Sequence, residues 1–581
     1  MRAALIDYRN GKNEDAFNLL KKNIDKFLKD SEALMTIAQI GASIKKDTSE
    51  VLEYAYQARR LGMNNPNIHI AYVGLFLGID DSFDKSLNLE KVGVDSSVCV
   101  KTDGESNKWY TILNDGPVDK GRGEILITDP LAKKMIGLKK DDTVPIRDGF
   151  YEKLEFTVVE IRSKYVNSLR ETLREFSSLF PENLSIQMMK NEDGDPTKAV
   201  ALSARRNQIV RQVSEFYTRE NLTIGQFSKL VGINQIQAWF GLGFNSGIVK
   251  VSAGTYEEQE EYAINVRGAK DVTLELTALL TLTNIKKLDL LSIRFENIYI
   301  AQTVLDVVIE EINAKQNFMT DHFSIEHNQD YMAIRETKKE QVQRDVDLLL
   351  GIKTFVQEKC KIVPVKLALK LGKEKYESLK DVLSPPSIDS VLVASETNTL
   401  LYTDDMILRG FAKIEFAVNG AWTQPILQDC VEKGQLSKDS YHELVAALIF
   451  ANYNFVSVKA ETLMFYLEKN NWNIVGETVR LFQVLAGPNT SIESAMQIVT
   501  TCIKEVWSKS LMLHQKIDIL NLTLGSLVEN RMSIPTIRLF INSVRKLYRN
   551  SFTPWYADEI IAHTNSWLHA HLSINQKNLL F

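Results

Sequence analysis

The sequence is poor in cysteine, and it contains no long apolar run. Its 4 cysteines among 581 residues lie far apart and form no CxxC pair or zinc-ligand spacing. We therefore expect buried thiols in a reducing compartment rather than a disulfide framework or a zinc site. No run reaches the roughly 18 apolar residues of a membrane span, and the N-terminus has no apolar signal region. These absences predict a cytoplasmic protein without a membrane-embedded part.

An excess of positive charge is also missing. Lys and Arg number 69 against 74 Asp and Glu, so the formal net charge is -5 at pH 7. The chain therefore has no bulk attraction for nucleic acid, and any such contact requires a local patch. Hydrophobic and charged contents of 44% and 25% are ordinary for a soluble globular protein. The length is sufficient for several domains.

Acidic residues gather around one predicted strand within residues 387–409. The pattern predicts a helix over residues 389–396, a short strand over residues 400–403 and a second helix soon afterwards. Asp404 and Asp405 come directly after the strand. Ligands of open parallel sheets bind outside the carboxyl ends of the strands. Carboxylates gathered there repel one another unless a divalent cation neutralises them, so the pattern predicts a Mg²⁺ or Mn²⁺ site.

A second group of acidic residues lies upstream. Residues 271–282 predict a strand that passes into a helix, with Glu275 at the exit. Another strand and a helix over residues 303–314 follow. That helix carries Asp306 and Glu310, which share one face because they are four residues apart.

Together the two stretches resemble the two halves of a PIN-domain nuclease, in which a late strand ends in Thr-x-Asp, here Thr403-Asp404-Asp405. The resemblance implies a Mg²⁺- or Mn²⁺-dependent hydrolase with Glu275, Asp306, Asp389 and Asp405 as metal ligands. It assigns catalytic roles to the same carboxylates and their neighbours, namely Glu275, Asp306, Glu310, Asp389, Asp404 and Asp405. The chain departs from the family pattern at two positions: Glu275 replaces an Asp, and the position near Asp306 lacks the usual Glu.

A simpler interpretation of Asp404 and Asp405 also applies. Acidic residues between a strand and a helix often cap the helix and stabilise its dipole. On that interpretation the pair has no role in chemistry.

Residues 85–164 change to β character. Residues 108–113 and 154–161 predict strands, and the segment between them resembles the C-terminal domain of the GreA/GreB transcript cleavage factors. Pro130 and Gly137 would start and stop a short helix there. The resemblance implies docking to RNA polymerase or another protein. It does not imply transcript cleavage, because no long coiled coil precedes the segment.

The remaining regions are predicted to be helical. Residues 1–84 resemble tetratricopeptide repeats, which bind protein partners on a concave face; a plain packing role is the alternative. Residues 165–268 form a helical linker domain, and residues 315–381 a helical insertion in the PIN-like domain over residues 269–467. Residues 468–581 form a C-terminal helical array.

Two helical segments suggest nucleic-acid contact by pattern. Residues 222–239 mimic a helix-turn-helix, but the second helix offers uncharged Asn and Gln where a DNA reader needs basic side chains, so a packing motif is favoured. The C-terminal array carries the best basic patch near Tyr548 and Trp555, although a solvated helix face explains it too. The basic residues of this patch are Arg531, Arg538, Arg545, Lys546 and Arg549.

The sequence thus predicts a multidomain α/β plus α protein: a PIN-like parallel sheet, a small β-rich GreA/GreB C-terminal-like module and helical-repeat arrays. This order resembles bacterial TPR-GreAB-C-PIN conflict-system proteins. It implies an antiviral defence effector whose nuclease acts on RNA, with single-stranded DNA as the alternative substrate. The rival hypothesis is a non-catalytic adaptor with a degenerate PIN fold that binds protein partners such as RNA polymerase.

Overall fold

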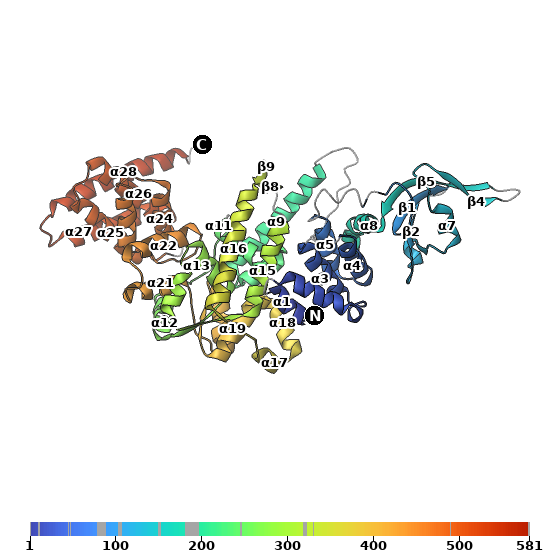
Figure 1. The fold of residues 1–581 in the computed structure, drawn as a ribbon. Helices are drawn as coiled ribbons and strands as arrows, with labels where there is room; N and C mark the ends of the chain where they lie inside the picture. Colours follow the sequence, from blue (N-terminus) through green and yellow to red (C-terminus); the bar gives the residue numbers. More distant parts are fainter. Residues whose placement is uncertain are drawn as a thin grey trace. The chain divides into compact units, whose positions relative to one another are not determined.

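The computed structural model describes most of the chain, in two compact units (Figure 1). The units are Met1–Ala204 with Ile312–Gln343, and Arg205–Glu311 with Arg344–Phe581. The described residues are 2–9, 12–44, 46, 48–77, 87, 89–102, 107–148, 153–180, 197–244, 247–317, 322–328, 331–487 and 490–578.

The first unit begins with helices that pack on their sequence neighbours, as amphipathic helices joined by short turns do. A buried cluster that includes Leu34, Ala55 and Tyr72 forms their core. The helices are α1 (Arg2–Arg9), α2 (Asn13–Lys22), the 3-10 turn η1 (Ile24–Lys26), α3 (Ser31–Ser43), α4 (Thr48–Leu61) and α5 (Pro66–Leu77).

A five-stranded sheet in the order β3-β2-β1-β5-β4 follows, and α7 packs on its core. The strands expected at residues 108–113 and 154–161 are confirmed, as is the helix that starts at Pro130 and stops before Gly137 (φ 88°). The elements are β1 (Ser96–Thr102), β2 (Lys108–Leu113), the turn η3 (Lys120–Arg122), β3 (Glu124–Leu126), α7 (Pro130–Met135), β4 (Thr143–Asp148), β5 (Lys153–Ser163) and α8 (Lys164–Leu179).

The second unit is built on a parallel sheet in the order β10-β7-β6-β11-β12. Its strands are β6 (Asp271–Leu274), β7 (Asn297–Ala301), β10 (Lys361–Val363), β11 (Leu400–Tyr402) and β12 (Gly420–Ala421). The chain first moves outward from β6 to β7 and β10, then returns to the other side of β6. The strand order therefore reverses between β6 and β11, which is where open parallel sheets bind ligands.

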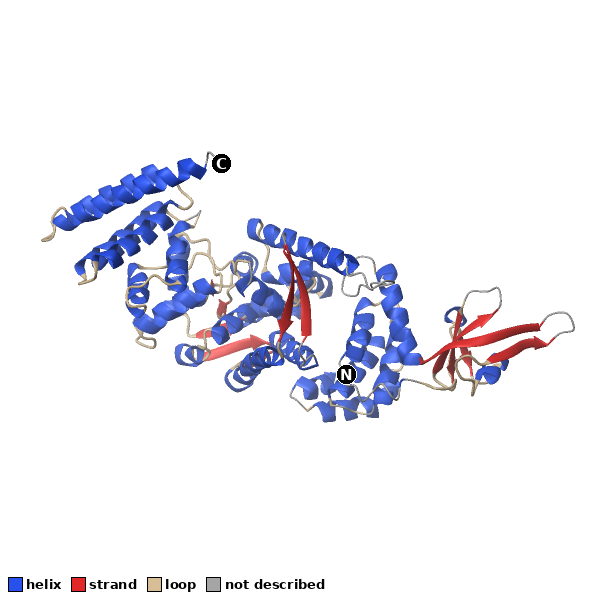
Figure 2. Cartoon of the chain, turned by 90° about the horizontal axis from the view of Figure 1, so that it is seen from above, coloured by secondary structure: helices blue, strands red, loops and turns tan. Residues whose placement is uncertain are grey.

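Helices surround this sheet (Figure 2). Helix α19 packs against β6, β7 and β11. Helices α9, α15 and α16 contain residues of both units. The helices up to the last strand are α9 (Thr197–Arg219), α10 (Ile224–Val231), α11 (Gln235–Phe244), α12 (Tyr256–Gly268), α13 (Leu276–Asn284), α14 (Asp289–Arg294), α15 (Gln302–Asn317), α16 (Lys339–Lys359), α17 (Leu367–Leu371), α18 (Lys373–Leu383), α19 (Pro385–Thr397) and α20 (Met406–Phe416).

The prediction of a wholly helical insertion over residues 315–381 is wrong. It contains an antiparallel hairpin, β8 (His322–Asn328) with β9 (Tyr331–Thr337), and it also contributes β10 to the parallel sheet. Helix α16 is therefore the crossover that a parallel strand pair requires. Three residues are too short for β10 to show a periodicity in the sequence.

A helical array completes the second unit. Its buried side chains include Trp507, Phe482 and Phe540. Its helices are α21 (Thr423–Glu432), α22 (Lys438–Phe450), α23 (Ala460–Lys469), α24 (Gly476–Gln483), the turn η4 (Val484–Ala486), α25 (Ile492–Ser508), α26 (Leu513–Val528), α27 (Ser533–Tyr548) and α28 (Trp555–Asn578).

Across the described ranges, no helix combines the length and apolar character that a membrane crossing requires.

A buried ion pair fastens α14 to α21. The side chains of Arg294 and Asp429 are 4% and 5% exposed, and the Arg294 guanidinium also donates to the carbonyls of Val266 and Ala269. Arg294→Ala leaves the Asp429 carboxylate buried with only Lys433 beside it. We expect a loss of about 3 kcal/mol in the free energy of unfolding, measured by urea denaturation.

An exposed ion pair in the same unit serves as the control. Lys270 and Glu296 are 80% and 69% exposed, with 3.8 Å between Nζ and Oε1. Lys270→Ala should change the free energy of unfolding by no more than about 0.5 kcal/mol. Equal effects of the two substitutions would show that the buried pair has no special role.

Candidate active site at the switch point of the sheet

The reversal of strand order brings Glu275 and Asp405 to the same end of the sheet. Glu275 follows β6 and Asp405 follows β11 after two intervening residues, and these strands are parallel neighbours. The backbone N–H of Glu275 donates to the carbonyl of Tyr402 at 3.0 Å, so the two strand exits are joined directly. Both carboxylates are buried, at 0% and 2% exposure.

Five hydrogen bonds from neutral donors hold the Glu275 carboxylate. Oε1 accepts from Gln235 Nε2 at 2.8 Å and from Ser387 Oγ at 3.2 Å. Oε2 accepts from the backbone N–H of Thr277 at 2.8 Å, which makes Glu275 the N-cap of α13. It also accepts from the hydroxyls of Thr277 (2.5 Å) and Thr403 (2.9 Å). Glu275 therefore connects α11, α13, α19 and the exit of β11.

Asp405 lies between two helix starts. Oδ1 accepts from the N–H of Leu408 at 3.1 Å, which caps α20 as the simpler interpretation predicts. Oδ2 accepts from the N–H of Ile224, the first residue of α10, at 2.6 Å. Burial, with a smaller contribution from the neighbouring Glu275 charge, raises the pKa of Asp405 to about 6, although the hydrogen bonds from Ile224 and Leu408 oppose this shift. The Thr403 hydroxyl links the two residues, because it donates to Glu275 Oε2 and accepts from the backbone N–H of Asp405 at 3.2 Å.

Asp404 is directed toward α21 instead. It accepts from the N–H and hydroxyl of Thr423 at 2.8 and 2.7 Å, and the Tyr453 hydroxyl lies 3.5 Å away. The residue is fully buried, and burial raises the pKa of its carboxyl group. These contacts attach β11 to α21 and suit a structural role.

Asp389 is placed differently from the sequence prediction. Helix α19 begins at Pro385 rather than at Asp389, because two prolines suit the first helical positions. Asp389 therefore lies inside the helix and is 2% exposed. Its carboxylate accepts from the hydroxyls of Tyr376 (2.6 Å) and Thr303 (2.9 Å). Burial raises the pKa of this carboxyl group.

The two remaining candidates lie on α15. Asp306 is half-buried and accepts from Gln302 Nε2 at 2.9 Å, whereas Glu310 is exposed. Within the described residues, no group of three or more His, Cys, Asp or Glu side chains is arranged to hold a metal ion.

The helical pair α10–α11, the segment with the helix-turn-helix pattern, covers this end of the sheet. Ile224 contributes its backbone N–H to Asp405, and Gln235 contributes its amide to Glu275. The Gln235 carbonyl oxygen accepts from Ser384 Oγ at 3.0 Å. Ser384 has φ 78°, a conformation that a non-glycine residue adopts at a cost.

Gly225 permits the close approach of α10. A Cβ atom added there would lie 2.2 Å from the Leu383 carbonyl oxygen and 2.7 Å from Ser384 Oγ. No sequence pattern marks Gly225 or Gln235 as part of the site, because their partners lie far along the chain.

A divalent cation does not fit at the Glu275 carboxylate in this arrangement. A carboxylate offers about four lone-pair positions. Glu275 accepts five hydrogen bonds, and both oxygens of Asp405 and of Asp389 accept one each from protein donors. A cation at Glu275 would therefore have to displace some of its donors, whereas Asp405 and Asp389 keep lone pairs.

The charge around the site is unbalanced. Arg409 is buried nearby and donates to the carbonyls of Thr403 and Val251 and to the Tyr262 hydroxyl, and its charge lowers the pKa of Asp404 and Asp405. It gives no hydrogen bond to either carboxylate among these contacts. Buried carboxylates near one another without paired cations destabilise a fold.

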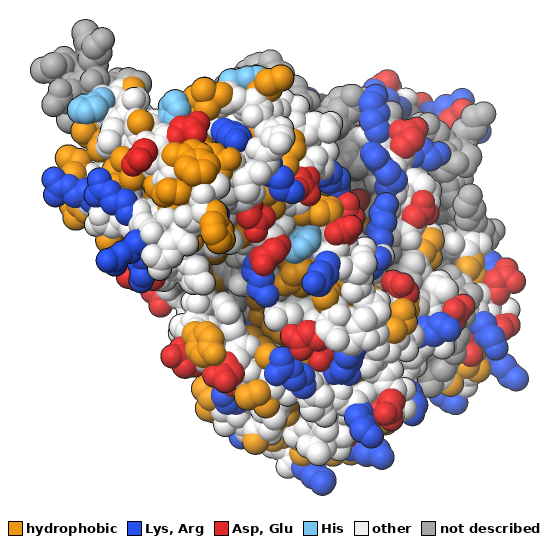
Figure 3. Space-filling model, turned by 90° about the vertical axis from the view of Figure 1, so that its left-hand side faces the viewer, with side chains coloured by type: hydrophobic (Ala, Val, Ile, Leu, Met, Phe, Trp, Pro, Cys, Tyr) orange, Lys and Arg blue, Asp and Glu red, His pale blue; other side chains and the backbone are white. Residues whose placement is uncertain are grey.

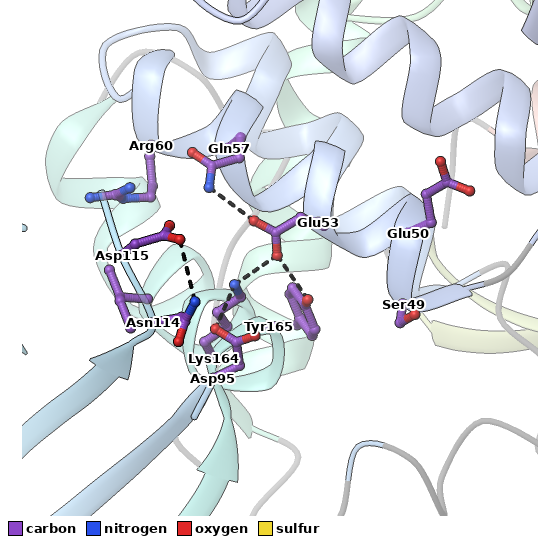
Figure 4. A pocket seen from close by; sticks show the side chains of 11 residues that line it. Ser49, Glu50, Glu53, Gln57, Arg60, Asp95, Asn114, Asp115, Lys164 and Tyr165 are labelled. Atoms are coloured by element: carbon purple, nitrogen blue, oxygen red, sulfur yellow. Dashed lines mark hydrogen bonds and ion pairs between the residues drawn. The ribbon is translucent and has the colours of Figure 1, made fainter. Parts of the chain in front are cut away.

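A polar pocket in the first unit is a weaker candidate (Figure 4). It has a volume of about 540 Å³, and α4 and the start of α8 contribute to its wall. The ammonium group of Lys164 pairs with Glu53 at 2.7 Å and with Asp95 at 2.8 Å. Burial alone would raise the pKa of Glu53, but hydrogen bonds from Lys164 and Gln57 lower it overall. The charged side chains of the pocket therefore pair with one another, which indicates a structural contact between the helices and the β-rich module rather than a ligand site.

The parallel sheet and its strand exits are compatible with a PIN-like α/β domain in the second unit. The sequence model of the family described as "PIN domain associated with the TPR-GreAB-C-PIN system" matches residues 273–414. The match covers about a quarter of the chain and spans Glu275, Asp306, Asp389 and Asp405. No curated protein and no solved structure matches the chain.

The family match connects this domain to a conflict system and to a class of domains that generally depend on divalent metals. It does not extend to residues 1–272, so the tetratricopeptide-like and GreA/GreB-like modules stay predictions from the sequence.

The raised pKa of Asp405 predicts a pH dependence of stability. The folded-state pKa of about 6 lies above the usual aspartate pKa of 3.8, so the folded state binds the proton more tightly than the unfolded state does. The stabilisation is complete below about pH 4 and is lost as pH rises through about 6. Relative to Asp405→Asn, the wild-type free energy of unfolding should fall by about 3 kcal/mol between pH 4 and 7. Parallel pH profiles of the two proteins in urea denaturation would contradict this assignment.

Proposed function

We propose that the chain is a latent metal-dependent phosphodiesterase, a PIN-like ribonuclease that acts as the effector of a prokaryotic conflict system. One observation supports the proposal: Glu275 and Asp405 follow the neighbouring parallel strands β6 and β11, and the helical pair α10–α11 donates a hydrogen bond to each carboxylate. RNA is the proposed substrate, with single-stranded DNA as the alternative.

The unbalanced charge supports a functional role for these residues. A Gln at position 275 could accept hydrogen bonds on its carbonyl oxygen without placing a negative charge beside Asp405. Groups with perturbed pKa values that lie in a ligand-binding crevice are candidates for function. Asp405 combines a raised pKa, burial and a position at the strand exit.

Withdrawal of α10–α11 would change what the carboxylates can bind. Glu275 would lose the Gln235 amide, and Asp405 would lose the Ile224 N–H. The freed oxygens are the ligand type that Mg²⁺ and Mn²⁺ prefer. Glu275, Asp405 and Asp389, with Asp306 or Glu310 from α15, are the proposed ligands and catalytic residues.

A non-catalytic adaptor is the second candidate. The complete hydrogen bonding of the Glu275 carboxylate favours it, because a fully satisfied polar network also stabilises a fold without any chemistry. In that case the helical modules and the β-rich module would bind protein partners, RNA polymerase among them.

Opening the site separates the two candidates. Gly225→Ala places a Cβ against the Leu383 carbonyl and forces α10 away from the start of α19. We expect at least tenfold faster Mn²⁺-dependent hydrolysis of a fluorescent single-stranded RNA than with the wild-type chain. EDTA or an added Asp389→Asn substitution should abolish the gain. A DNA strand of the same sequence tests the alternative substrate.

Gly241→Ala is the matched control, because its Cβ would meet nothing within 4 Å in the same helical pair. It should leave hydrolysis at the wild-type rate. If Gly225→Ala melts well below the wild type, Gln235→Ala removes the donor to Glu275 without a clash. If Gly225→Ala and Gln235→Ala fold but hydrolyse neither RNA nor DNA, the nuclease proposal is wrong and the non-catalytic adaptor remains.

A further inference from the structure

The segment from 530 to 557 has a charge unlike that of the rest of the chain. It contains no Asp or Glu, although the whole chain has a net charge of -5. Its basic residues are Arg531, Arg538, Arg545, Lys546 and Arg549. A local patch of this kind is what nucleic-acid contact requires in an acidic protein.

Helix α27 displays most of these charges on one side. Its opposite side is buried through Ile537, Phe540 and Val544, and the helix packs against α25, α26 and α28. Arg538, Arg545 and Arg549 recur at intervals of seven and four residues. At 3.6 residues per turn, this spacing aligns them in one stripe along the helix. All three are exposed, as is Lys546 beside them.

The structure distinguishes the stripe from a structural arginine in the same segment. The Arg531 guanidinium donates to the carbonyls of Leu485, Leu527 and Thr490 at 2.9 to 3.0 Å, so it holds the array together. Among the described residues, by contrast, Arg538, Arg545, Lys546 and Arg549 form no ion pair with an acidic side chain. Their charge is therefore available to a partner.

Two exposed aromatic rings follow the stripe. Phe552, in the turn after α27, is 99% exposed, and Trp555, the first residue of α28, is 58% exposed. Figure 3, which views the side of the molecule that carries these helices, shows Lys and Arg side chains beside exposed hydrophobic ones. Exposed rings next to unpaired cations form the combination that stacks bases while holding phosphates.

We propose that this surface binds single-stranded nucleic acid. We call it the α27 stripe and define it as Arg538, Arg545, Lys546, Arg549, Phe552 and Trp555. The basic side chains hold successive phosphates, and the two rings stack against bases. An acidic protein partner would use the cations but gain little from the rings. The proposal deepens the nuclease hypothesis by giving the substrate a docking surface, and binding itself does not require an active centre.

Fluorescence anisotropy tests the surface directly. The full chain is titrated into a labelled 20-nucleotide single-stranded RNA, and into DNA of the same sequence, in EDTA at 50 and 200 mM salt. The triple substitution Arg538→Gln, Arg545→Gln and Arg549→Gln should raise Kd at least tenfold and flatten the salt dependence by about two log units per log unit of salt. Phe552→Ala and Trp555→Ala should each raise Kd about fivefold or more without changing the salt dependence.

The control removes the same charge from elsewhere in the unit. Lys438→Gln, Lys459→Gln and Lys504→Gln substitute three exposed lysines outside the stripe, and this protein should bind like the wild type. Equal losses in the two triple variants would overturn the proposal, as would no wild-type binding at 50 mM salt. Displacement by polyglutamate, with no effect of the aromatic substitutions, would assign the stripe to an acidic protein instead.

Binding and hydrolysis report separately on the two proposals. If the Gly225→Ala protein binds RNA but does not hydrolyse it, the nuclease proposal is wrong and the proposal for the α27 stripe still holds. If the protein hydrolyses RNA but the stripe substitutions change neither Kd nor KM, the proposal for the α27 stripe is wrong and the nuclease proposal still holds.

Discussion

The hydrogen bonds of the buried Glu275 carboxylate are the interaction on which this end of the second unit depends. A buried charge without hydrogen bonds costs several kcal/mol, so each donor must be held in place. Gln235 donates only while α11 lies against the sheet, and Ser387 only while α19 begins where it does. The approach of α10 in turn requires a glycine at position 225. The hydrogen bonding of the Glu275 carboxylate therefore depends on the packing of α10–α11 against the sheet.

The buried carboxylates also destabilise the arrangement in which α10–α11 packs over them. Neutral donors satisfy the oxygens of Glu275 and Asp405 but do not cancel their charge. Burial, and to a smaller extent the Glu275 charge, disfavours the ionised form of Asp405 and raises its pKa. Ser384 adds backbone strain at the point where α10 and α19 meet. A segment held against like charges and strain is easier to displace than an ordinary core helix.

The parts of the fold that depend on local pattern were predictable from the sequence. Strands β6, β7 and β11 are apolar and end in polar residues, so their positions and the acidic residues after them could be predicted. Strands β10 and β12 have three and two residues, too few for any periodicity, and they exist because their neighbours pair with them. The start of α19 was misplaced because two prolines after Ser384 resemble a loop in sequence, although they suit a helix start. Gln235 could not be predicted, because its partner Glu275 is 40 residues away and uncharged donors carry no distinctive motif.

Mn²⁺ binding by the opened site is the most direct test of this account. Isothermal titration would compare the wild-type chain with Gln235→Ala and with the double variant Gln235→Ala, Glu275→Gln. Gln235→Ala should bind Mn²⁺ at least tenfold more tightly than the wild type, and the added Glu275→Gln substitution should remove the gain. Equal Mn²⁺ affinity in all three proteins would contradict the claim that α10–α11 closes a cation site.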